Sequence, residues 1–194
     1  PQGGVIDLHH RLQQPGCPPP RDLAAILAGA EAETLGGVAI AVPTRPQAVL
    51  IAALNFTKEF AHRRPSARYA YDVAAGLTGM DAAEHAAFAA LAEAQRLAGT
   101  VGLAAALAER IFGLDLPLAA PLEAAPLPDW AERAGLLAMA FDPDSPTVPW
   151  PRRRAVLWAM CSGGPASGGR AAEYAREAAR MAASEALRRA APAG

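Results

Sequence analysis

The longest regular pattern of apolar and polar positions runs from Ala48 to Leu77 and predicts two helices separated by a break. Apolar residues recur at helical spacing in the first segment, which predicts one buried face along Leu50, Ile51, Leu54 and Ala61. The sequence AHRRPSA then interrupts the pattern. The second segment has its own inward stripe of Tyr69, Val73 and Leu77, with Asp72 beside it.

Polar residues of the first helix fall on one face. Asn55, Lys58, Glu59 and His62 are separated by three, four and seven positions, so a helix presents them together. One interpretation is a solvated helix face next to a core stripe. The other is a functional cluster, because Lys58 is the only lysine among many arginines and places a compact ammonium at this point.

The segment Val5 to His10 is rich in apolar residues and predicts a strand. Alternation places Asp7 on the same face as Val5 and His9. A carboxylate flanked by apolar residues must be solvated, paired or bound to a metal. Asp7 therefore has two interpretations. It lies on the solvent-exposed face of an edge strand, or it is a ligand that holds Mg²⁺ near phosphates.

Between Asp22 and Thr44 we expect one helix and one strand. Asp22 suits an N-cap, and the helix that follows it fades at Gly36-Gly37. Val38 to Val42 has strand character and could pair with the first strand. Thr44 and Gln47 form a capping box that starts the helix containing Lys58.

From Asp81 onward the pattern predicts helix after helix. Asp81 is the expected N-cap, Gly99 the expected interruption and Gly113 the expected end of the next segment. A proline-spaced linker at 116–128 precedes a helix over 130–141, and a Gly/Ser/Pro break precedes a polar C-terminal helix. The fold class is therefore α+β, with short N-terminal strands and a predominantly helical remainder. We expect three regions, at 1–47, 48–162 and 163–194.

The composition of the chain limits the classes of partner and site that we expect. The chain has 194 residues and a formal net charge of −1, so no global field favours nucleic acid or an anionic membrane. No apolar run is long enough for a membrane span, and no signal peptide opens the chain. Cys17 and Cys161 favour neither a disulfide scaffold nor a zinc site. A bacterial cytoplasm is the expected location, and the start at Pro1 suggests part of a longer chain.

Three segments resemble one known family. The strand VIDLHHRL, the helices AVLIAALNFTKEF and RYAYDVAAGL, and the closing sequence GLDLP are similar to motifs of the bacterial nucleotidyltransferase-like family, within the polymerase-beta-type superfamily. The resemblance covers about Gly4 to Pro117. Two departures are visible: no Gly-Ser turn with an Asp-x-Asp pair precedes the strand, and the two histidines that flank the family's lysine fall at Asn55 and Glu59.

The resemblance implies Mg²⁺-dependent transfer of a nucleotidyl group from an NTP to an unknown acceptor. It implies that Asp7 is the catalytic metal ligand. It also implies that Lys58, Arg63 and Arg64 lie near phosphates, and that Asp72 contacts nucleotide or substrate.

Because one carboxylate cannot assemble a two-metal site, several alternatives stay open. The missing half lies upstream, or on another chain, or the chain has kept the scaffold and lost the reaction. In the last case it is a non-catalytic helical binding or assembly module with a protein partner, and the thin apolar stripe of the C-terminal helix suits a partner's groove. A purely structural helical domain is the third possibility.

Overall fold

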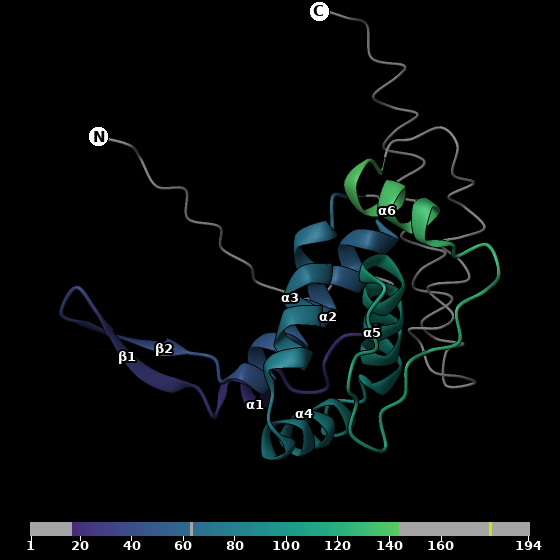
Figure 1. Cartoon of the computed structure of the whole chain (residues 1–194). Coiled ribbons are helices and arrows are strands. Elements are labelled where there is room, and N and C mark those ends of the chain that lie inside the picture. The colour runs from purple at the N-terminus through teal and green to yellow at the C-terminus, as the bar shows by residue number, and fades with distance from the viewer. Residues whose placement is uncertain (1–16, 63, 144–178, 180–194) are drawn as a thin grey trace, which may run out of the picture.

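A computed structural model describes residues 17–62, 64–143 and 179. These residues form a short helix, a two-stranded hairpin and a helical body (Figure 1). The elements are α1 (Leu23–Leu27), β1 (Glu31–Leu35), β2 (Val38–Val42), α2 (Arg45–Ala61), α3 (Ala67–Gly79), α4 (Ala82–Ala94), α5 (Ala98–Phe112) and α6 (Arg133–Phe141). The α+β, predominantly helical fold is therefore confirmed. The expected strand at 5–10 and the C-terminal polar helix lie outside the described residues.

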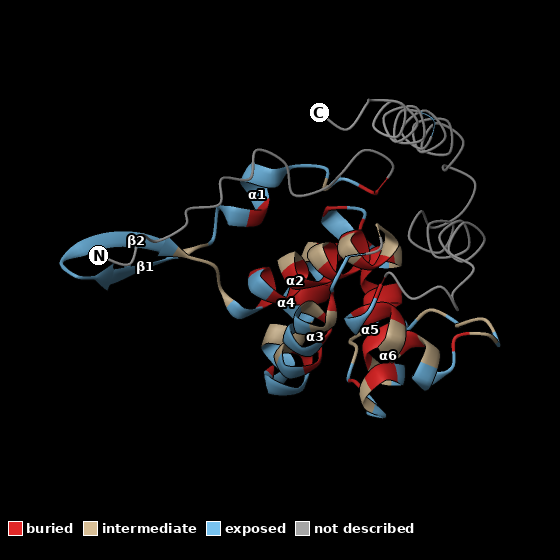
Figure 2. Ribbon diagram, turned by 90° about the horizontal axis from the view of Figure 1, so that it is seen from above, coloured by how far each residue is buried: buried red, intermediate tan, exposed pale blue. Residues whose placement is uncertain are grey.

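Helix α2 lies at the centre of the helical body and packs against α3, α4 and α5. Its side chains Leu50, Leu54 and Phe56 are fully buried, and the rings of Phe56 and Phe60 meet edge to face with centroids 5.7 Å apart. Figure 2 shows buried residues concentrated where these helices meet. Burial of large apolar side chains on several sides of one helix supplies most of the driving force for this packing.

The ends of α2 and α3 agree with the sequence pattern. The backbone N–H of Thr44 donates to Gln47 Oε1 at 2.8 Å, which is the reciprocal bond of the predicted capping box. The helix ends at Ala61, before Pro65. Ser66 then precedes α3, and its backbone N–H donates to the carbonyl of Ala140 at 2.9 Å, which ties the break to the end of α6.

The expected helix over 23–36 is wrong in its second half. Helix α1 ends at Leu27, and Glu31–Leu35 forms a strand paired antiparallel with β2, with Leu35 opposite Val38. Gly36 and Gly37 have φ of 59° and 83°, a left-handed conformation that only glycine adopts without steric cost. Two such residues in a row form the two-residue turn of a hairpin. The strand at 38–42 is confirmed, but its partner in the structure is β1.

The predicted interruption at Gly99 is also wrong. Helix α4 starts at the expected N-cap, where the backbone N–H of Glu84 donates to Asp81 Oδ1 at 2.8 Å. It ends at Ala94, and Arg96 takes the left-handed conformation with φ of 58°. Gly99 instead lies in the first turn of α5. Leu97, the residue after this turn, is fully buried in the core, and its burial favours a turn at Arg96.

The remaining boundaries follow the pattern closely. Helix α5 ends at Gly113, a left-handed residue with φ of 67°, as predicted. The linker at 114–132 contains neither strand nor α-helix, and α6 begins at Arg133, three residues after the expected start at Trp130. Leu136, Met139 and Ala140 are buried where α6 packs against α5.

The contact between α2 and α3 depends on the absence of a side chain at Gly76. A Cβ placed there would lie 2.2 Å from Val49 Cγ2. Because valine is stiff at χ1 and buried, Gly76→Ala should lower the free energy of unfolding by about 1 to 3 kcal/mol, measured by urea denaturation. The matched control is Gly79→Ala in the same helix, where a Cβ meets no atom within 4 Å.

Helix propensity predicts that this control is neutral or stabilising by up to about 1 kcal/mol. Combining Gly76→Ala with Val49→Ala should cost less than the sum of the two single changes, because the clashing methyl group is removed. Equal stability of Gly76→Ala and Gly79→Ala would contradict the close packing of α2 and α3.

Candidate functional site

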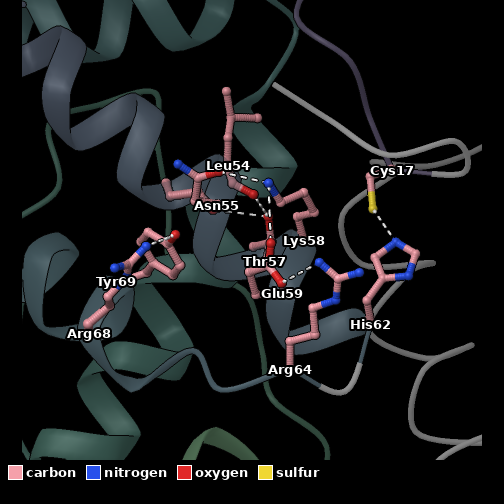
Figure 3. A network of polar contacts seen from close by, with 11 residues as sticks. Cys17, Leu54, Asn55, Thr57, Lys58, Glu59, His62, Arg64, Arg68 and Tyr69 are labelled. Atoms are coloured by element: carbon pink, nitrogen blue, oxygen red, sulfur yellow. Dashed lines mark hydrogen bonds and ion pairs between the residues drawn. The ribbon is translucent and has the colours of Figure 1, made fainter. Parts of the chain in front are cut away.

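A cluster of polar side chains occupies the C-terminal half of α2 (Figure 3). Lys58 is at its centre and only 5% exposed. Its Nζ atom donates to Asn55 Oδ1 at 3.0 Å and forms an ion pair with Glu59 Oε1 at 3.3 Å. A buried ammonium needs such partners because its desolvation is costly. The predicted convergence of these residues is confirmed, whereas the expectation of a solvated face is wrong for Lys58.

The other oxygen of the Glu59 carboxylate faces the break after α2. Arg64 Nη1 lies 3.7 Å from Glu59 Oε2, and the Arg64 backbone N–H donates to the Glu59 carbonyl at 2.9 Å. The two side chains differ in solvent access, with 63% of Arg64 and 12% of Glu59 exposed. Each oxygen of this carboxylate therefore faces a different cation.

This arrangement limits what Lys58 can do chemically. Its ammonium is nearly inaccessible and already paired with a carboxylate, so a phosphate could reach it only by displacing Glu59. Arg64 is the exposed cation of the network. Arg63 and Asp7, the other residues assigned to phosphate or metal, lie outside the described residues. Across the described part of the chain, no group of three or more His, Cys, Asp or Glu side chains could hold a metal ion.

Asp72 lies on a groove between α2 and α3 rather than in the Lys58 network. The groove encloses about 440 Å³ and combines a floor of small residues with four polar side chains: Arg45, Asn55, Tyr69 and Asp72. Asn55 belongs to both features, because it lines the groove and also accepts the hydrogen bond from Lys58. The structure therefore brings Asn55 and Asp72 to one concave surface.

Arg45 lines this groove and Arg68 contacts the groove residue Tyr69, and both arginines are already bound to protein groups. Arg45 Nη1 donates to Glu84 Oε2 at 3.0 Å and to the carbonyl of Gly79. Arg68 stacks over the Tyr69 ring with 4.4 Å between its Cζ atom and the ring centroid, and it donates to the Tyr69 hydroxyl. That hydrogen bond raises the pKa of Arg68 above its ordinary value. The groove thus offers apolar surface with an anionic rim at Asp72.

The sequence pattern missed two features of this structure. Cys17 Sγ lies 3.7 Å from His62 Nε2, although 45 positions separate them in the chain. A second groove of about 530 Å³ lies beside α5 and α6 and is lined by Arg110 and Arg133. These arginines donate to the carbonyls of Ala131 and Ile111, at 3.3 and 3.0 Å. No local periodicity signals such contacts, because each joins distant segments.

Comparisons with protein-family models, curated proteins and solved structures give no match for this chain. The resemblance to nucleotidyltransferases therefore stays a prediction that rests on the quoted motifs. Within the described residues, no helix is both long and apolar enough to cross a membrane.

The role of the Lys58 network can be tested by removing its charges singly and together. Lys58→Met keeps the apolar stem but leaves the Glu59 carboxylate without its closest cation, so the free energy of unfolding should fall by about 1 to 3 kcal/mol. Lys58→Met with Glu59→Gln should recover most of that loss. Both are measured by chemical denaturation monitored by circular dichroism.

Arg64→Met is the matched control, because it removes an exposed partner of the same carboxylate. It should change stability by no more than about 0.5 kcal/mol. If Lys58→Met were as mild as Arg64→Met, the ammonium would not stabilise the fold, and a role in ligand binding would gain support.

Proposed function

We propose that this chain is an assembly module, in which the helical body supports the β1–β2 hairpin as a contact element. The observation that carries the proposal is the exposure of the hairpin. Every residue of β1 is exposed, and in β2 only Val42 is partly covered. The hairpin extends away from the helical body in Figure 1 and is coloured as exposed along its length in Figure 2.

Three of the exposed residues of this hairpin are large and apolar. Leu35 is 70% exposed, Val38 63% and Ile40 40%. The register places Leu35 opposite Val38 and Glu33 opposite Ile40, so the three apolar side chains share one face of the hairpin with Glu33. Contiguous exposed apolar surface is typical of protein interaction sites. A two-stranded hairpin is also marginal on its own, so a partner strand or surface would stabilise it.

Nucleotidyl transfer, the activity implied by the resemblance, has less support from the described residues. Lys58 is paired with Glu59, and Asp7 and Arg63 fall outside the described part of the chain. Mg²⁺, an NTP and a hydroxyl acceptor therefore stay predictions, as does a cytoplasmic location.

A thermal-unfolding scan with each NTP and Mg²⁺ at millimolar concentration separates the two functions. Ligands that bind the folded state raise the unfolding midpoint by mass action. An assembly module should show no midpoint shift with any nucleotide. A metal-dependent shift that Asp7→Ala removes would contradict this expectation and favour the transferase.

Removing the hairpin tests whether it belongs to the core. We expect that replacing residues 31–42 by a short Gly-Ser linker changes the unfolding midpoint by no more than about 2 °C, because so little surface of the hairpin is buried. The measurement is a circular-dichroism melt of the helical signal. A large fall in the midpoint would show that the hairpin stabilises the helical body, and the proposal of a contact element would then fail.

A further inference from the structure

We infer that the hairpin pairs with a second copy of this chain, edge to edge through β2, an inference that rests on the proposed function. The two edges of the hairpin differ in charge. β1 carries Glu31 and Glu33, whereas β2 reads Val-Ala-Ile-Ala-Val, with neither charge nor proline. Charged side chains and prolines are the usual protection of an edge strand against another strand. In the part of the chain that the structure describes, the edge formed by β2 has no such protection.

No described residue other than those of β1 pairs with β2, so the backbone of β2 presents hydrogen-bonding groups along this edge. In a two-residue hairpin the pair that flanks the turn is hydrogen-bonded, and bonded and non-bonded pairs then alternate. The flanking pair here is Leu35 with Val38, so the N–H and C=O groups of Ala39 and Ala41 point away from β1. Both residues are exposed. A strand that approaches β2 therefore meets two residues with outward donors and acceptors.

A second β2 strand fits this edge in one full-length register. Antiparallel pairing about a two-fold axis at Ile40 places Ile40 opposite its counterpart, Ala39 opposite Ala41 and Val38 opposite Val42. All five residues of each strand are then paired, and every cross-strand pair is apolar. The outward-pointing Ala39 and Ala41 form the hydrogen-bonded pairs of the new ladder. The contact is isologous, so it closes as a dimer and does not propagate.

The charge distribution favours β2 over β1 as the pairing edge. In the β2 dimer, Glu31 and Glu33 lie on the outer strands of the four-stranded sheet, far from their counterparts. Pairing through β1 would instead bring the glutamates of two copies together, and facing like charges destabilise a sheet. The net charge of −1 adds little repulsion between whole chains.

Proline at an outward position removes one donor of the new ladder without breaking a bond of the hairpin. Ala41→Pro should therefore raise the dimer dissociation constant by about tenfold or more, measured by sedimentation equilibrium over a range of protein concentrations. Ala32→Pro is the matched control, because Ala32 lies directly opposite Ala41 and also points its backbone groups outward, but from β1. It should leave the dimer constant unchanged within about twofold.

Both proline variants must keep the helical circular-dichroism signal of the natural sequence. A natural chain that stays monomeric up to about 500 µM would overturn the inference, and so would equal weakening by the two prolines. Neither result bears on the proposed function, which is tested separately by the nucleotide scan and by deletion of the hairpin. Dimerisation that survives deletion of residues 31–42 would also overturn the inference, because it would place the contact elsewhere.

The register has its own test. Ile40→Cys should form a disulfide between two copies on mild oxidation, since the introduced thiols face each other across the two-fold axis. Leu35→Cys lies on the same face but on the outer strand, and it should not cross-link. Peptide mass mapping distinguishes these products from bonds through Cys17 or Cys161. Equal cross-linking by both variants would overturn pairing through β2.

Discussion

The burial of α2 on several sides is the constraint on which the rest of this structure depends. This 17-residue helix packs against three other helices, and Leu50, Leu54 and Phe56 have no exposed surface. Close approach is possible because Gly76 of α3 leaves room for Val49. A helix enclosed in this way cannot leave polar groups unpaired at low cost, so its polar residues must find partners within the protein.

The Lys58 network is the direct result of that constraint. Asn55, one helical turn away, and Glu59, the next residue in the chain, are the partners of the buried Lys58 ammonium. Arg64, in the break after α2, approaches the second oxygen of the Glu59 carboxylate. The cluster resembles a functional site in its residue types, yet its charges are satisfied by each other. Open polar surface lies instead in the neighbouring groove, where Asp72 is exposed and Asn55 joins the two features. Residue type alone therefore does not separate a structural network from a binding site.

The β1–β2 hairpin, unlike α2, is almost entirely exposed. It owes its form to local chemistry, namely two glycines with positive φ and two short strands in register, and it shares almost no buried surface with the helices. An element that adds little to the core is free to serve as a contact surface, which is where binding residues are commonly found. In the proposed function, the helical body therefore supplies the stability and the hairpin supplies the contact surface.

The sequence by itself determined the elements whose signals are local. The capping box at Thr44, the N-cap at Asp81, the glycine end of α5 at Gly113, and the apolar spacing of α2 and α3 each act within a few residues, and each was predicted correctly. The Gly36-Gly37 hairpin was also a local signal, but it was read as the end of a helix. The α+β class and the convergence of Asn55, Lys58 and Glu59 followed from periodicity alone.

Tertiary structure decided what periodicity cannot encode. Helix α4 ends at Ala94 and the chain turns at Arg96 rather than at Gly99, because burial of Leu97 offsets the cost of a positive φ at a residue other than glycine. The contact of Cys17 with His62, and the groove that gathers Asn55 and Asp72, join segments that only packing brings together. Whether Lys58 faces water or the core was equally beyond the sequence. A helical pattern shows which residues share a face, whereas the neighbouring helices determine which face is covered.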